Sequence, residues 1–308
     1  MTQKPAPRFG KYEILQLLGR GGMAEVYMAR FVEGPRAGQT VALKRLMPRL
    51  AQDAEAVDLF CGEADVSSML KHPHIVEVLE AGVVSEVYYL TMEFVDGRDL
   101  ALVLARCHAR GIFLPVSFAV HIVLCTLSAL GYAHGAHGPT GLPLHIVHCD
   151  VSPSNLFISR QGEIKLGDFG IAKVRALSGD DESAPLWGKL AYLAPEQLDR
   201  KPLSPQVDLW GAAAILYETL TNTRAIRGVS AEEMQQALRL GQIGGPLEEF
   251  RSDVPPGLTA VLRRALDLDP RNRYATAAEF ADALRPFHDE PSGGALGIAS
   301  VVRGLFKT

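Results

Sequence analysis

Three oxygen-bearing side chains in the middle of the chain have types suited to holding a metal-bound phosphate. They are Asp150, Asn155 and Asp168. Carboxylate and amide oxygens are the ligands that Mg²⁺ prefers, so together they could supply what a magnesium nucleotide requires. The alternative for each residue taken alone is a turn cap, because Asp and Asn are common in loops for that reason.

A glycine-rich stretch and a lysine nearer the N-terminus add groups that can approach phosphates. The stretch is Gly19-Arg20-Gly21-Gly22-Met23-Ala24-Glu25-Val26, whose small residues allow backbone N–H groups close to a phosphate. By itself it could equally be an ordinary hairpin turn. Lys44 ends the apolar run Thr40-Val41-Ala42-Leu43, where a lone lysine is costly unless its charge has a partner.

Short β-type segments must position the glycine-rich stretch and Lys44. The pattern predicts strands at residues 12–15, 26–29, 40–44, 75–80 and 87–94. Residues 54–70 are predicted to be a helix, because Val57, Phe60 and Ala64 recur at spacings of three and four. After Gly97 the segments are longer and helical, at residues 118–134, 207–220, 231–240 and 258–268.

The order of five motifs in this chain resembles that of a eukaryotic-type protein kinase. After the glycine-rich stretch come Val41-Ala42-Leu43-Lys44, His148-Cys149-Asp150-Val151-Ser152-Pro153-Ser154-Asn155, Asp168-Phe169-Gly170 and Ala194-Pro195-Glu196. One such string arises often by chance, but five in this order do not. The Asp-Val-Ser-Pro sequence in the catalytic loop resembles a subset of bacterial kinases of the myxobacterial type. The resemblance therefore indicates a bacterial, eukaryotic-like Ser/Thr protein kinase.

The resemblance implies an α+β, bilobal protein kinase-like fold with a small β-rich lobe and a larger α-rich lobe. The implied divisions are an N-terminal extension at residues 1–11, a kinase domain at 12–288, and a linker with a short apolar tail at 289–308. Within the domain, the N-lobe would span residues 12–95 and the C-lobe 98–288. The tail could be a docking or membrane-surface helix. Loose packing on its own domain, or fraying, is the simpler expectation.

Kinases of this family transfer the γ-phosphoryl group of MgATP by positioning and charge stabilisation. The resemblance implies that Asp150 orients the substrate hydroxyl and accepts its proton, while Asn155 and Asp168 ligate Mg²⁺. Lys44 would hold the α- and β-phosphates, with Glu63 as its partner. Glu55 is the competing partner, although capping of the helix start also explains it.

The same resemblance implies a nucleotide pocket on the segment that links the lobes. The residues expected there are Leu18, Gly19, Arg20, Gly21, Gly22, Val26, Ala42, Met92, Glu93, Val95, Asp99 and Phe157. Met92 would limit the depth of the pocket, and backbone groups of Glu93 and Val95 would bind the base. Asp99 would either meet the ribose or cap the following helix.

Further resemblances concern structural residues. Glu196 and Arg273 would form a buried ion pair, and Asp208 would hold the backbone of the catalytic loop. His148 and Phe169 would stack on one another as packing residues.

Two departures from the family pattern lie near Asp150. Cys149 stands where most of these kinases have Arg, which removes the cation that a phosphorylated activation segment pairs with. Ser152 stands where a lysine is usual, and Lys189 where a threonine is usual. We expect the Lys189 ammonium to reach Asp150, and the Ser152 hydroxyl to supply the missing threonine's hydrogen bond. The alternative is that Lys189 points into solvent.

Composition agrees with a globular protein and excludes several classes. The 308 residues are 47% hydrophobic and 21% charged, with a net charge of −4, so a nucleic-acid partner is not indicated. Four scattered cysteines fit reduced thiols in a cytosolic protein. We see no secretory signal at the N-terminus and no run of about 18 apolar residues. These features predict a cytoplasmic protein without a transmembrane segment.

Three functions remain in competition. The first is an active Ser/Thr kinase that uses ATP and Mg²⁺ on protein substrates. The second is a pseudokinase scaffold that binds nucleotide or a partner without transfer. The third is a small-molecule phosphotransferase. The Ala-Pro-Glu segment, Asp208 and Arg273 favour a protein substrate over a small molecule. The sequence does not identify the substrate or the oligomeric state.

Overall fold

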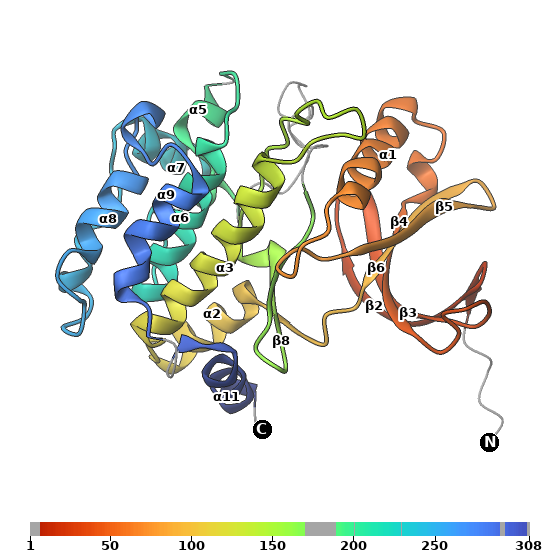
Figure 1. The fold of residues 1–308 in the computed structure, drawn as a ribbon, viewed down its shortest axis with the longest axis horizontal. Coiled ribbons are helices and arrows are strands. Elements are labelled where there is room, and N and C mark those ends of the chain that lie inside the picture. The colour runs from red at the N-terminus through yellow and green to blue at the C-terminus, as the bar shows by residue number, and fades with distance from the viewer. Residues whose placement is uncertain (1–6, 170–188, 200, 229, 290–292, 307–308) are drawn as a thin grey trace. The chain divides into compact units, whose positions relative to one another are not determined.

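The computed structural model describes residues 7–169, 189–199, 201–228, 230–289 and 293–306 (Figure 1). These residues form two compact units. The first unit holds the described residues up to Lys71 together with Val76–Val95, and the second holds His72–Ile75 and the described residues from Asp96 onward. A sheet dominates the first unit and helices dominate the second. The predicted α+β class is therefore confirmed.

An antiparallel six-stranded sheet in the order β1-β2-β3-β4-β6-β5 forms the first unit. Its strands are β1 (Arg8–Phe9), β2 (Tyr12–Arg20), β3 (Ala24–Phe31), β4 (Thr40–Leu46), β5 (Val78–Val84) and β6 (Val87–Glu93). Tyr12, Phe31 and Leu43 gather with Phe9 in one buried cluster. Phe9 belongs to the predicted N-terminal extension, so the sheet includes residues that the motif pattern did not assign to it.

Strand β5 lies later in the chain than the predicted 75–80. Its hairpin with β6 turns through Ser85 and Glu86, whose φ angles are 48° and 62°. Two consecutive left-handed residues are typical of a type I′ turn, which Asn-Gly or Asp-Gly usually signals. Ser-Glu carries no such signal, which explains why the strand predicted at 75–80 ends four residues too early.

Helix α1 (Ala54–Met69) is the helix of the first unit and confirms the prediction at 54–70. Its N-cap is Asp53, whose carboxylate accepts hydrogen bonds from the N–H groups of Glu55 and Ala56. The helix packs against β5 and β6. Phe60, Glu63 and Ala64 are among its buried residues.

The second unit surrounds a long central helix, α3 (Val116–His134), which packs against α6 and α9 (Figure 1). The other helices are α2 (Leu100–Arg110), α5 (Pro195–Leu198), α6 (Gln206–Thr221), α7 (Ala231–Arg239), α8 (Leu258–Ala265), α9 (Ala277–Leu284) and α11 (Ala295–Phe306). A three-stranded sheet joins β7 (Gly97–Asp99), β8 (Leu156–Ser159) and β9 (Ile164–Leu166). The helices predicted from residue 118 onward are thus confirmed within a few residues.

Helix α3 is the one described helix whose length and composition would allow it to cross a bilayer. Its apolar window is 67% buried within the unit. Burial by α6 and α9 accounts for an apolar helix of this kind in a protein core.

The segment His72–Ile75 belongs to the second unit although it was predicted within the N-lobe. Backbone contacts explain the difference, because Leu166 N–H donates to His74 O at 2.9 Å and Ile75 bridges to Leu166. The His72 ring also stacks on Tyr132 of α3.

The C-terminal helix α11 packs on α2 and has four buried side chains, Ile298, Ala299, Val302 and Leu305. The Phe306 ring lies 5.3 Å from the guanidinium of Arg98 and 5.4 Å from that of Arg106. Gly162, with φ of 89°, allows the Ala295 carbonyl to approach, since a Cβ there would lie 1.8 Å from that oxygen. The tail therefore packs on its own unit, as expected, but closely rather than loosely.

Candidate active site

The buried lysine of the first unit has a carboxylate partner. Lys44 Nζ lies 2.5 Å from Glu63 Oε1, and the two side chains are 13% and 12% exposed. A buried ammonium requires such a partner to offset its lost hydration. Glu55, the competing candidate, lies in the first turn of α1, next to the capping Asp53. The prediction of Glu63 as the partner of Lys44 is confirmed.

The glycine-rich loop turns between β2 and β3, where Gly21 N–H donates to Ala24 O at 2.8 Å. A Cβ at Gly19 or Gly22 would meet no atom within 4 Å, and neither residue has a left-handed φ. Neither packing nor backbone conformation among the described residues therefore requires glycine at these two positions. A loop without side chains here fits the close approach of a phosphate to backbone N–H groups.

Ala24 occupies the position of the family's third glycine. Its methyl group is buried with Leu46 and Phe60 in the second cluster of the unit. The substitution thus adds a core contact at the start of β3.

Glu25 joins the two strands of the loop through a network that the sequence analysis missed. Its carboxylate lies 2.9 Å from Arg20 Nε and accepts from Tyr27 Oη at 2.7 Å and Arg45 Nη2 at 3.0 Å. The Tyr27 hydroxyl and the two arginines hold the pKa of Glu25 below its ordinary value. Because Arg20 pairs with Glu25 across the hairpin, the network fixes the base of the glycine-rich loop.

One face of the sheet presents three half-buried apolar side chains beside Lys44. Val26 pairs with Lys44 across β3 and β4, and Ala42 pairs with Met92 across β4 and β6. Residues two apart on a strand share a face, so these side chains lie together. This face could take an adenine ring next to the ammonium that would hold the phosphates. Leu18, at the end of β2, is 45% exposed.

The segment expected to bind the base begins at the end of β6. Glu93 N–H donates to Glu77 O at 2.9 Å, so this N–H is engaged within the first unit. Val95 is the last residue of the first unit.

In the second unit, Asp208 of α6 holds the backbone of the loop that carries Asp150. Its two carboxylate oxygens accept from the N–H groups of His148 and Cys149, each at 2.8 Å. Cys149 has a φ of 63°, which is unfavourable for a residue with a side chain, and the two bonds stabilise it. The predicted role of Asp208 is confirmed.

Asp150 is the buried carboxylate that this loop presents. Asn155 Nδ2 donates to Asp150 O at 2.8 Å and to Asp150 Oδ2 at 2.7 Å. Both donor hydrogens of the amide are thereby used, which leaves Asn155 Oδ1 as an oxygen ligand for a cation. Asn155 closes the short 3-10 turn Pro153–Asn155, directly before β8.

Asp168 and Phe169 follow β9. Asp168 adopts a left-handed φ of 55°, and the Phe169 ring lies 4.6 Å from the His148 ring. His148 Nδ1 accepts from Asp150 N–H at 3.2 Å, so this ring also contacts the loop that carries Asp150. The predicted contact between His148 and Phe169 is confirmed, but the rings are tilted at 48° rather than stacked.

The oxygen set fits a magnesium ion. Carboxylate and amide oxygens without thiolate or imidazole suit Mg²⁺, which keeps several waters and takes few protein ligands. Among the described residues, no group of three or more His, Cys, Asp and Glu side chains forms a metal site of its own.

Lys189 reaches Asp150, as predicted. Its Nζ lies 2.6 Å from Asp150 Oδ2, and the side chains are 33% and 5% exposed. The alternative, a lysine that points into solvent, is wrong. The Ser152 Oγ lies 3.1 Å from Ser154 Oγ. Among the described residues this is the contact that the Ser152 hydroxyl makes, so its replacement of the missing threonine stays a prediction.

The segment after Lys189 is tied to the unit by a buried ion pair. Arg273 donates to both carboxylate oxygens of Glu196, at 2.7 and 2.8 Å, which confirms the predicted pair. Gln197 Nε2 also donates to Cys149 O at 3.0 Å, a link that the sequence analysis missed. Burial beside Asp208 and Asp150 raises the pKa of the Cys149 thiol well above its ordinary value. Ser178 and Ser183 lie outside the described residues.

Asp99 caps a helix. Its Oδ1 accepts from Leu102 N–H at 2.7 Å, at the start of α2. Of the two predicted roles, capping is therefore confirmed, and its other oxygen stays a candidate for a ribose. Phe157 pairs with Asp99 across β8 and β7.

Comparison with known proteins gives consistent matches. A family model described as "Protein kinase domain" matches residues 12–283. Tyrosine-protein kinase MasK of Myxococcus xanthus is 33% identical over 300 residues, which cover 97% of this chain and 46% of the relative. Serine/threonine-protein kinase PknB of Mycobacterium tuberculosis is 34% identical over 295 residues, with 93% and 44% covered. The crystal structure of the Mycobacterium tuberculosis PknI kinase domain superposes with a TM-score of 0.66 at 28% identity and covers 93% of this chain. The chain thus spans less than half the length of the curated relatives named here.

Proposed function

Because the chain belongs to the protein kinase family, we propose that it transfers the γ-phosphoryl group of ATP to serine or threonine hydroxyls of a protein in bacterial signalling. The contacts that carry the proposal are those of the buried Asp150 carboxylate with Asn155 and with the partly exposed Lys189. A pseudokinase would not need to keep a buried carboxylate between an amide and an ammonium. We also propose that the kinase domain spans residues 12–288, and that the protein acts in the cytoplasm.

Asp150 would accept the proton of the attacking hydroxyl. Its carboxylate is 5% exposed and is held by Asn155 Nδ2 at 2.7 Å, so its direction is fixed before a substrate binds. Lys189 would neutralise charge that develops on the transferring group, from a position 2.6 Å from Asp150. Each contact is preorganised by buried neighbours rather than made during the reaction.

Lys44, fixed by Glu63, would hold the α- and β-phosphates. Asn155 and Asp168 would hold Mg²⁺, which when bound neutralises negative charge on the phosphates. Leu18, Val26, Ala42, Met92 and Phe157 would contact the base, and Gly19, Arg20, Gly21 and Gly22 would cover the phosphates. Glu93 and Val95 would bind the base through backbone groups, and Asp99 the ribose.

Two substitutions test the proposal. Lys44→Met and Asp168→Asn should each lower the rate of radiolabel transfer from ATP to a generic protein substrate by about 10² to 10³, as loss of one preorganised charge contact does. Circular dichroism should show unchanged folding. Near-normal transfer by either folded variant would refute the site assignment.

The choice of hydroxyl needs its own measurement, because one relative is named a tyrosine kinase and another a serine/threonine kinase. Phosphoamino acid analysis of the labelled substrate should yield phosphoserine or phosphothreonine. If phosphotyrosine alone is found, the proposed preference for serine and threonine is wrong, whereas the proposed transfer of the phosphoryl group from ATP still holds.

A further inference from the structure

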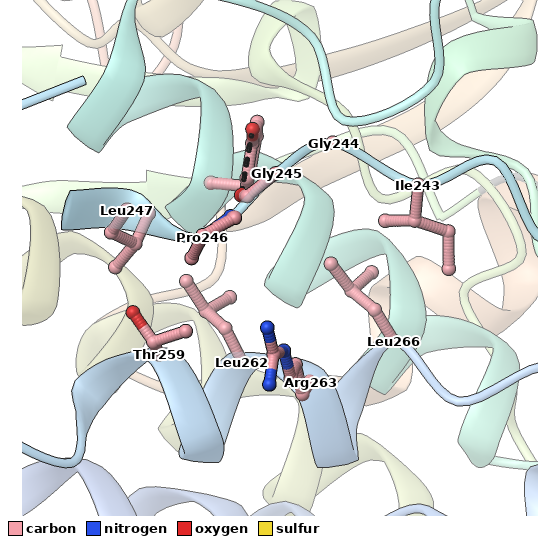
Figure 2. Close-up of a pocket in the computed structure, with 10 residues that line it drawn as sticks. Ile243, Gly244, Gly245, Pro246, Leu247, Thr259, Leu262, Arg263 and Leu266 are labelled. Carbon is pink, nitrogen blue, oxygen red and sulfur yellow. Dashed lines mark hydrogen bonds between the residues drawn. The ribbon is translucent and has the colours of Figure 1, made fainter. Parts of the chain in front are cut away.

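The second unit contains a cavity of 310 Å³ that none of the residues proposed for phosphoryl transfer lines. Its walls come from Tyr217 of α6, the segment from Ile243 to Leu247, and one side of α8 (Figure 2). The volume lies at the lower end of the range of small-molecule sites, about 300 to 1,000 Å³. The cavity is therefore large enough for a small organic molecule.

The interior of the cavity is apolar. Leu247, Leu262 and Leu266 are at most 4% exposed and form its inner wall. Tyr217 Oη, the polar atom that reaches this wall, donates to Gly245 O at 3.2 Å, as the dashed line in Figure 2 marks. Its hydrogen is thereby engaged within the protein. The inner part of the cavity thus suits a hydrocarbon group.

One cation lines the mouth of the cavity. Figure 2 shows the guanidinium of Arg263 between Leu262 and Leu266, directed toward the Gly244–Pro246 side. Within the described part of the chain, Arg263 makes no hydrogen bond or ion pair. Arg264, the next residue, is instead paired with Glu279 at 2.6 Å and lies over the Tyr274 ring. The charge of Glu248 already acts on Arg263, but the guanidinium donates no hydrogen bond to it. At the mouth of an apolar cavity such a guanidinium can bind a carboxylate in a bidentate manner.

A carboxylate of the protein lies near the same mouth. Glu248 Oε2 accepts from Thr259 Oγ1 at 2.8 Å, and Thr259 lines the cavity. The field of Glu248 opposes an anionic ligand, whereas that of Arg263 attracts one. The two residues therefore allow the charge preference of the site to be tested in both directions.

We propose that this cavity binds a small amphipathic carboxylate, with its hydrocarbon chain against Leu247, Leu262 and Leu266 and its carboxylate on Arg263. The proposal does not rest on the phosphoryl-transfer site, because no residue is shared between the two. The apolar chain would supply affinity and the guanidinium would supply the preference for an acid over an alcohol.

The test compares octanoate with octan-1-ol on the full chain, by isothermal titration calorimetry and by methyl NMR. Octanoate should bind and shift the methyl signals of Leu262 and Leu266. Arg263→Gln should weaken octanoate about tenfold or more, as loss of a charge-assisted hydrogen bond does, and change octan-1-ol less than twofold. Glu248→Gln, which keeps a partner for Thr259, should strengthen octanoate.

Two controls complete the experiment. Arg264→Gln removes the same charge from the same helix outside the cavity, and octanoate affinity should stay within twofold. Ile243→Phe should fill the cavity and reduce binding of both probes. The proposal is overturned if octanoate does not bind, if Arg263→Gln leaves its affinity unchanged, or if Ile243→Phe does so. Concentration-dependent dimerisation abolished by Ile243→Phe would instead identify a second copy of the chain as the occupant, and would also overturn it.

Discussion

Replacing Lys189 by threonine tests whether an ammonium from the activation segment does the work of a catalytic-loop lysine. The Lys189–Asp150 pair joins a one-third exposed cation to a carboxylate that is 5% exposed, at 2.6 Å. Removing one preorganised charge contact to the transition state lowers the rate by about 10² to 10³. A loss of about 10² corresponds to about 2.7 kcal/mol of transition-state stabilisation.

The assay is radiolabel transfer at saturating ATP, with Lys189→Thr compared to the wild-type chain and to Lys201→Thr. Lys201 is a matched control, because its ion pair with Asp199 is 62% exposed on the lysine side and lies away from Asp150. Lys189→Thr should lose about 10² in rate, and Lys201→Thr should lose little.

A second variant distinguishes lost charge from lost structure. Ser152→Lys added to Lys189→Thr should recover a substantial part of the rate, since it returns an ammonium to the same loop as Asp150. A normal rate for Lys189→Thr would refute a role for the ammonium. A double variant no better than the single one would refute the idea that a lysine at position 189 does the work of a lysine at position 152.

Three further predictions concern other parts of the site. Glu25→Gln should raise KM for ATP several-fold with a smaller change in kcat, because the base of the glycine-rich loop loses its charged network. Steady-state kinetics across ATP concentrations would measure both constants, and an unchanged KM would contradict the prediction. Glu196→Gln should lower the free energy of unfolding by about 3 kcal/mol in urea titration, since it leaves the buried Arg273 without its carboxylate, and a loss below 1 kcal/mol would count against that reasoning. Ser178→Ala combined with Ser183→Ala should change the basal rate less than about threefold, because Cys149 offers no cation to a phosphate on the activation segment. The prediction would be disproved if phosphatase treatment of the wild type caused a large loss of rate that autophosphorylation restored.

The motif series was sufficient to predict the family, the fold class and most of the paired charges. The contacts of Asp208 and Arg273 were predictable because each residue has one kind of partner in this family. Asp208 binds backbone N–H groups and Arg273 binds a carboxylate, and burial leaves few other partners for either charge. The Lys189 contact was predictable for a related reason, since a charge removed at position 152 had to be replaced nearby.

Other contacts depend on details that spacing does not carry. Ser152 has a second hydroxyl two residues away, and no pattern indicated which hydroxyl it would choose. To predict the Glu25 network, one must know which residues of the β2–β3 hairpin pair with each other. The glycine-rich turn between the strands does not determine this register. The Gln197 link to the Cys149 carbonyl joins segments 48 residues apart, and amide side chains give no sequence signal for such a bond.

The C-terminal helix has a consequence for how the protein is handled. A chain shortened to residue 288 would lose α11 with its buried Ile298, Val302 and Leu305, and would uncover the part of α2 that this helix contacts. Arg98 and Arg106 would lose the Phe306 ring that both now contact. Uncovered apolar patches of this kind drive association between copies. We therefore expect removal of residues 289–308 to lower the solubility of the protein before it lowers the catalytic rate.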